Sequence, residues 1–253
     1  MALLGTDSAT FRRPAWPVER LTLQVATVIA FDLVVLIGAL ALWPEGIGPG
    51  VWLAALAAYA LGSGLAVAGV RRGYPHRVLG LCNAVTHLRA TLVVFLAAAL
   101  VAGAAAAPLG WALAGIAAAV LALDGADGWL ARRRGLVSRF GARFDVETDA
   151  VFAAVLAAAA LSSGKIGWPE AVVLGAARYA FQMAGLGLPW LRAPLPERLR
   201  RKAICVLQLS VLVVLLAPAA DGAAARLAGV AAALAVVASF ALDIRTLWRQ
   251  RRG

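Results

Sequence analysis

Carboxylates gather in one short stretch of an otherwise apolar chain. Residues 123–150, LDGADGWLARRRGLVSRFGARFDVETDA, contain Asp124, Asp127, Asp145, Glu147 and Asp149. A carboxylate at the centre of a membrane costs about 2.5 to 3.5 kcal/mol, so several of them need a compensating cation. The nearest spare arginines lie in the turn between the two acidic segments, whereas hard divalent cations prefer carboxylate oxygens, water and phosphate. The stretch therefore predicts a site for Mg²⁺ or Mn²⁺.

The spacing of the aspartates predicts two polar helix faces. Residues three or four apart share one face of a helix, and each pair of aspartates has such a spacing. With a rise of about 1.5 Å per residue, all four aspartates are expected at a similar depth on two antiparallel helices that face each other. Glu147 falls off this face and is expected at the membrane interface or paired with an arginine of the turn. The two stripes comprise Asp124, Asp127, Gly128, Ala131 and Arg132, and then Gly141, Asp145 and Asp149.

The composition is that of a membrane protein. Hydrophobic residues make up 62% of the 253 residues, whereas a soluble domain is usually about half apolar. The net charge of +11 comes from arginine clusters between long apolar runs, which favours anionic lipid headgroups over nucleic acid as the partner.

Eight apolar runs are long enough to cross a bilayer as helices, which need about 20 apolar residues each. Basic residues concentrate in alternate connections, and by the positive-inside rule these connections and both termini are expected in the cytoplasm. The basic segments are residues 12–20, 71–89, 132–143, 192–202 and 245–252. The predicted fold is an all-α, polytopic membrane helix bundle with spans near residues 21–42, 51–70, 84–106, 109–131, 144–163, 169–190, 203–219 and 223–244.

The acidic stretch has the pattern DxxDGxxAR, eight residues, then GxxxDxxxD, running from Asp124 to Asp149. This pattern resembles the signature of the CDP-alcohol phosphotransferase family, whose members are integral membrane enzymes of phospholipid synthesis. Upstream, CNAVTHLRATLV resembles the start of the family's first core helix, in which Asn, Thr and Arg recur as in Asn83, Thr86 and Arg89. The resemblance implies a six-helix core at residues 76–253, and residues 1–75 would then hold a cytoplasmic segment and two added spans.

The resemblance also implies roles for the motif residues. Asp124, Asp127 and Asp145 would be metal ligands, and Asp149 would contribute to the metal site and act as the base. The CDP part of the donor would lie against Gly128, Ala131, Arg132, Ser138 and Gly141. The implied reaction is transfer of a phosphatidyl group from CDP-diacylglycerol to a small polar alcohol, with release of CMP. The Ala-rich sequence with its arginine clusters favours a bacterial inner membrane, and the basic turn places the expected site on the cytoplasmic side. The resemblance implies a homodimer.

Basic residues near the motif are candidates for binding an anionic acceptor such as glycerol 3-phosphate or an inositol phosphate. Arg178 lies in the middle of a span, where an arginine either pairs with a motif carboxylate or binds the acceptor. Lys202 resembles a lysine of the glycerophosphate branch of the family, although Ile204 and Cys205 depart from that pattern. Arg89 is the third candidate.

Three alternatives remain open at this stage. The same fold could use a CDP-choline or CDP-ethanolamine type of donor with a lipid acceptor. The intramembrane carboxylates could instead belong to a transporter or channel, because acidic residues also mark ion pathways. The chain could finally be an inactive scaffold of the same fold.

Overall fold

The computed structural model describes residues 18–44, 46–103, 109–193 and 199–252. The basic residues Arg12, Arg13 and Arg198 of the predicted cytoplasmic segments lie outside the described residues. The described parts form helices and no strand, which confirms the all-α prediction. The elements are α1 (Val18–Ala41), α2 (Pro49–Arg71), α3 (Gly80–Val101), α4 (Leu109–Arg134), α5 (Arg139–Ser162), α6 (Trp168–Gly187), the 3₁₀ helix η1 (Pro189–Arg192), α7 (Leu199–Leu216) and α8 (Gly222–Arg252).

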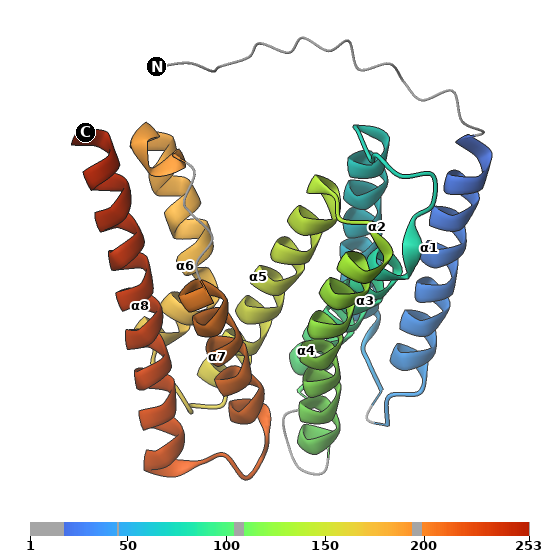
Figure 1. Cartoon of the computed structure of the whole chain (residues 1–253). Helices are drawn as coiled ribbons and strands as arrows, with labels where there is room; N and C mark the ends of the chain where they lie inside the picture. The colour runs from blue at the N-terminus through green and yellow to red at the C-terminus, as the bar shows by residue number, and fades with distance from the viewer. Residues whose placement is uncertain (1–17, 45, 104–108, 194–198, 253) are drawn as a thin grey trace.

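Successive α-helices run in alternating directions through the bundle (Figure 1). The start of α1 and the end of α8 therefore lie at the same end of the bundle, as the even number of predicted spans requires. By length and composition, five helices of the described part are candidate membrane spans, namely α1, α2, α3, α4 and α8. Helix α5 has Arg139, Arg143 and three carboxylates in its first half, which lowers its hydropathy.

Helix α3 is the central element around which the site is built. It packs extensively against α4 and α5 on one side and against α1 and α2 on the other. Helices α4 and α5 contact each other little, although a short turn joins them, and they diverge from that turn in Figure 1. The backbones of α4 and α5 thus lie apart, while carboxylates of their facing polar stripes come within 4.8 Å of one another beside α3.

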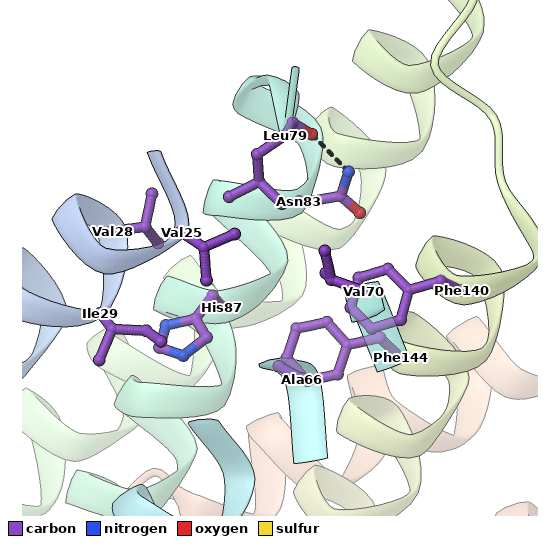
Figure 2. Close-up of a pocket in the computed structure, with 10 residues that line it drawn as sticks. All are labelled: Val25, Val28, Ile29, Ala66, Val70, Leu79, Asn83, His87, Phe140 and Phe144. Carbon is purple, nitrogen blue, oxygen red and sulfur yellow. Dashed lines mark hydrogen bonds between the residues drawn. The ribbon is translucent and has the colours of Figure 1, made fainter. Parts of the chain in front are cut away.

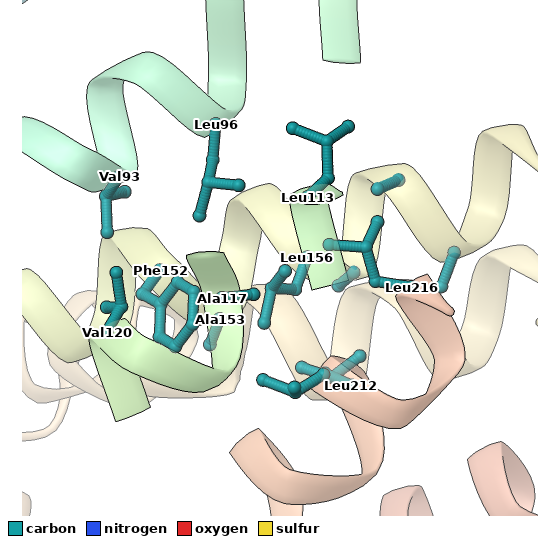
Figure 3. Close-up of a cluster of buried hydrophobic side chains, with 14 of the residues drawn as sticks. Val93, Leu96, Leu113, Ala117, Val120, Phe152, Ala153, Leu156, Leu212 and Leu216 are labelled. Carbon is teal, nitrogen blue, oxygen red and sulfur yellow. The ribbon is translucent and has the colours of Figure 1, made fainter. Parts of the chain in front are cut away.

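The buried core below the acidic motif is made of Leu, Val, Phe and Ala side chains from four helices. Figure 3 shows this cluster, in which bulky residues alternate with alanines that let the helix backbones approach closely. Because the cluster joins α3, α4, α5 and α7, it fixes the helix ends that carry the motif. Its labelled members are Val93, Leu96, Leu113, Ala117, Val120, Phe152, Ala153, Leu156, Leu212 and Leu216.

Candidate active site

The turn between α4 and α5 is set by one glycine and one serine. Gly135 has φ of 64°, a left-handed conformation that glycine adopts readily and that ends α4. Ser138 is the N-cap of α5, and its Oγ accepts a hydrogen bond from the Gly141 backbone N–H over 2.9 Å. An N-cap serine satisfies one of the free N–H groups at a helix start. Ser138 is buried, and its hydrogen bond with the Gly141 N–H stabilises the start of α5.

All four motif aspartates meet at the guanidinium group of Arg89. Arg89 Nη2 lies 2.9 Å from Asp124 Oδ1, and Nη1 lies 2.8 Å from Asp127 Oδ2 and 2.7 Å from Asp145 Oδ1. Arg89 Nη2 also donates to Asp149 Oδ1. Arg89 is fully buried, whereas Asp124, Asp145 and Asp149 are partly exposed. The structure thus brings the four aspartates to one place and at one depth.

Arg89 corrects one step of the sequence argument. The nearest spare arginines were expected in the turn, but the arginine that pairs with the aspartates comes from α3. Arg89 was named as part of the family's first core helix and as a candidate for acceptor binding, whereas its guanidinium lies buried among the carboxylates. Only its Nε atom is buried without a hydrogen-bond partner. The aspartates still outnumber the guanidinium by four charges to one, so one arginine cannot neutralise them.

The donor set fits a hard divalent cation. Carboxylate oxygens of Asp124, Asp127 and Asp145 lie within 4.8 Å of one another, close enough to share one ion. These are oxygen ligands, as Mg²⁺ and Mn²⁺ prefer, and three uncompensated negative charges in a low-dielectric region favour a bound cation electrostatically. The residues therefore fit the metal that the motif implies.

A second side chain of α3, Thr86, also contacts Asp127, and hydrogen bonds fix the start of α3. Thr86 Oγ1 donates to Asp127 Oδ2 over 2.9 Å. One turn earlier, Asn83 Nδ2 donates to the Tyr74 hydroxyl over 2.9 Å and to the Leu79 carbonyl over 2.6 Å. Tyr74 lies in the connection before α3, and its burial raises the pKa of the phenol to about 12. These contacts hold the first turns of α3 against the motif.

The two motif glycines lie close to polar side chains. A Cβ atom added at Gly128 would lie 3.4 Å from Arg132 Nη1, so the exposed Arg132 side chain folds over the glycine. A Cβ atom added at Gly141 would lie 3.0 Å from Asn83 Oδ1 and 3.1 Å from Ser138 Oγ. Ala131 is partly exposed on the same helix. Small residues at these positions permit a phosphate to approach the backbone.

A comparison with known protein families agrees with this geometry. The profile of CDP-alcohol phosphatidyltransferases matches residues 79–241, from the start of α3 into α8. The chain belongs to the CDP-alcohol phosphatidyltransferase family. The matched residues include the whole acidic motif and Arg89, while α1 and α2 precede them. No solved structure matches the chain.

Two of the acceptor candidates of this CDP-alcohol phosphatidyltransferase lie outside the carboxylate cluster. Arg178 Nη2 lies 2.8 Å from Glu147 Oε1, so Arg178 pairs with the acidic residue of the 123–150 stretch that lies off the motif face. Glu147 was expected at the membrane interface or paired with an arginine of the turn, and its observed partner comes from α6. Arg178 Nε is buried and has no hydrogen-bond partner. Lys202 is exposed near the start of α7.

Sequence reasoning missed two sets of contacts in this family member. The first is the bond from Thr86 to Asp127, which was recognised only as a family pattern. The second joins Asp32, Ser63 and His87. The signal for the second set was Asp32, a carboxylate in the middle of an apolar span, because such a residue requires a partner.

Proposed function

We propose that the protein transfers a phosphatidyl group from CDP-diacylglycerol to the hydroxyl group of a small polar alcohol and releases CMP. The observation that carries this proposal is the convergence of the four motif aspartates, with three of them spaced to share a metal ion. Membership of the family supports the reaction class. The choice of CDP-diacylglycerol and of an acceptor such as glycerol 3-phosphate or an inositol phosphate is the finer part of the proposal.

On the donor side, the motif residues bind and orient the diphosphate. Asp124, Asp127 and Asp145 hold the divalent cation, which when bound neutralises charge that develops on the leaving group. Arg132 lies beside Gly128, and we assign its guanidinium to the phosphates because its planar donors match phosphate oxygens. Gly128, Ala131 and Gly141 allow the nucleotide to approach both helices, and Ser138 orders the turn between them.

The bond changes balance without any further reactant. The oxygen of the acceptor alcohol attacks the phosphorus that is linked to diacylglycerol, and the bond from that phosphorus to the CMP oxygen breaks. Asp149 accepts the proton of the attacking hydroxyl. Arg89 donates to Asp149, and a divalent cation bound beside this carboxylate would favour its ionised form, so Asp149 would then be a weak base. Positioning of the two substrates must therefore supply much of the rate enhancement.

The acceptor is the least defined part of the proposal. Arg178 is the first candidate for its anionic group, since the buried Nε has no partner and the pair with Glu147 is about one-third exposed. Lys202 is exposed and can reach an anionic headgroup, whereas Arg89 acts on the acceptor only through the carboxylates that it contacts. A negatively charged alcohol fits this set better than choline or ethanolamine.

The basic turn after α4 supports a cytoplasmic site in an inner membrane, because basic connections lie on the cytoplasmic side. The location of CDP-linked donors and CMP in the cytoplasm agrees with this. Within this proposal, residues 76–253 form the catalytic core and residues 1–75 an added part with α1 and α2. A homodimer is proposed from the family alone.

In the test, purified protein is incubated with Mg²⁺, a panel of alcohols and radiolabelled CDP-diacylglycerol. A separate incubation replaces that donor by radiolabelled CDP-choline with diacylglycerol. We expect CMP and a new phospholipid only from CDP-diacylglycerol with an anionic alcohol. Asp149→Asn should reduce CMP release at least 100-fold. Glu170→Gln serves as the matched control, because Glu170 is a partly exposed carboxylate in the first turn of α6 and is not part of the motif. Transfer from CDP-choline, or full turnover by Asp149→Asn, would contradict the proposal.

A further inference from the structure

Asp32, His87 and Ser63 form a chain of hydrogen bonds across three helices. His87 Nδ1 lies 2.6 Å from Asp32 Oδ2, and His87 Nε2 lies 3.1 Å from Ser63 Oγ. The three residues come from α1, α2 and α3, and all are more than nine-tenths buried. Both ring nitrogens of His87 are therefore held, one by each of the two helices that precede the family match.

Aromatic side chains complete the surroundings of the His87 ring. The ring of Tyr59 meets it edge-on with centroids 5.8 Å apart, and Phe144 of α5 lies 6.3 Å away. Figure 2 shows His87 at the wall of a pocket that is otherwise lined mainly by apolar side chains of α1, α2, α3 and α5. In these surroundings an imidazole without partners would be costly, so the two hydrogen bonds fix its orientation.

The order of groups matches that of an Asp–His–Ser catalytic triad, but the surroundings do not suit a nucleophile. Ser63 lies in the interior of α2 and is 6% exposed, so a substrate carbonyl has no access to its hydroxyl. The backbone N–H groups around it belong to a continuous helix and offer no oxyanion hole. The trio therefore acts within the protein.

The trio lies next to the residues that hold the aspartates. His87 directly follows Thr86, which donates to Asp127, and precedes by two residues Arg89, which contacts all four aspartates. In a helix with 3.6 residues per turn, one residue corresponds to a rotation of about 100°. A rotation of α3 that released His87 from α1 and α2 would thus also turn Thr86 and Arg89 away from the motif.

We infer that His87 is a positioning residue for phosphatidyl transfer, held by Asp32 and Ser63 so that α3 presents Thr86 and Arg89 to the four aspartates. This inference rests on the proposed function. It gives α1 and α2 a role in the reaction: each contributes one polar side chain that sets the rotation of α3. Asp32, which would otherwise be a costly carboxylate in a span, is stabilised by the same contact.

The experiment compares His87→Gln, Asp32→Asn and Ser63→Ala in the full-length protein in detergent. Thr91→Val is the control, because Thr91 is a buried hydroxyl on α3 that donates only to the His87 backbone carbonyl. Three quantities are measured: the melting temperature, the affinity for Mn²⁺ alone, and kcat and KM with CDP-diacylglycerol. We expect Asp32→Asn and His87→Gln to weaken Mn²⁺ binding about 5-fold or more and to lower kcat at least 10-fold, with KM for the donor within 3-fold of wild type.

A double exchange, together with Ser63→Ala, keeps the test decisive. The exchange Asp32→His with His87→Asp should restore Mn²⁺ affinity relative to either single change, because it re-forms the pair in reverse. Ser63→Ala removes one hydrogen bond and should fold even if the variants at Asp32 and His87 do not. We expect it to lose Mn²⁺ affinity to an intermediate extent. A lower melting temperature with unchanged Mn²⁺ affinity and kcat would overturn the inference. If wild type releases no CMP, the proposed function fails, while the Mn²⁺ affinities still test the role of His87.

Discussion

Arg89 Nη1 lies 2.8 Å from Asp127 Oδ2, and both side chains are almost completely buried. The same guanidinium contacts the other three motif aspartates, so one cation from α3 offsets part of the negative charge of α4 and α5. Removal of one partner from a buried ion pair costs about 3 to 5 kcal/mol, because the remaining charge stays buried. Arg89 and a bound divalent cation would therefore act on the same carboxylates.

Arg89→Gln should destabilise the metal-free protein by several kcal/mol, and added Mg²⁺ should recover more stability in the variant than in wild type. Melting temperatures with EDTA and with Mg²⁺ measure both effects. Arg178→Gln is the matched control, since the pair of Arg178 with Glu147 is about one-third exposed and such pairs are worth about 0 to 1 kcal/mol. Equal losses in the two variants would contradict the central position of Arg89.

Gly141→Ala should impair the site, whereas Gly125→Ala should not. A Cβ atom at position 141 would lie 3.0 Å from Asn83 Oδ1, while one at position 125 meets nothing within 4 Å. We expect CMP release to fall about 10-fold for Gly141→Ala and to stay within 2-fold for Gly125→Ala. Alanine is favoured over glycine in a helix by about 0.5 to 1 kcal/mol, so Gly125→Ala should also melt at a slightly higher temperature. Full activity of Gly141→Ala would show that the Asn83 and Ser138 side chains move to accommodate the added methyl group without loss of function.

A divalent cation should stabilise the protein through the aspartates. At a concentration about 100 times its dissociation constant, a ligand of the native state stabilises by about 2.7 kcal/mol. Mg²⁺ or Mn²⁺ should therefore raise the melting temperature of EDTA-treated protein by several degrees. The shift should be largely lost in Asp127→Asn, which removes one carboxylate of the group within 4.8 Å, and kept in Glu170→Gln. An equal shift in both variants would place the ion elsewhere.

Tyr74 should make the protein sensitive to alkaline pH. Burial raises the pKa of this phenol to about 12 in the folded protein, against about 10 in an unfolded chain. The folded state thus holds the proton more tightly, and stability present below about pH 10 should decline between about pH 10 and 12. Tyr74→Phe cannot lose this proton, so the advantage of wild type over the variant in melting temperature should shrink from pH 9 to 12. A constant difference would argue against the buried phenol.

The sequence predicted the number and order of the helices because long apolar runs separated by basic turns leave few alternatives. It also predicted that Asp124, Asp127, Asp145 and Asp149 would gather, since their spacing fixes the face and the turn fixes the depth. These are local properties of two neighbouring helices. The roles of the individual aspartates as ligands and base remain predictions.

The missed contacts of Arg89 and His87 depend on where α3 lies. The pairing of Arg89 with four aspartates requires α3 to contact both α4 and α5, and no local spacing specifies that arrangement. The same holds for His87, whose partners are 55 and 24 residues away along the chain. The charge of Asp32 and of Arg89 inside apolar runs indicated that partners exist, but helix packing decides which ones.

The hydrogen bond between His87 and Asp32 also limits how far this protein can be shortened. A fragment that starts at residue 76 would keep every residue of the family match and yet present a bare imidazole to lipid tails. When such an enzyme is shortened to a minimal unit, we expect this fragment to lose metal affinity before it loses helical structure. Co-expression of residues 1–75 as a separate peptide would then be the natural way to rebuild it.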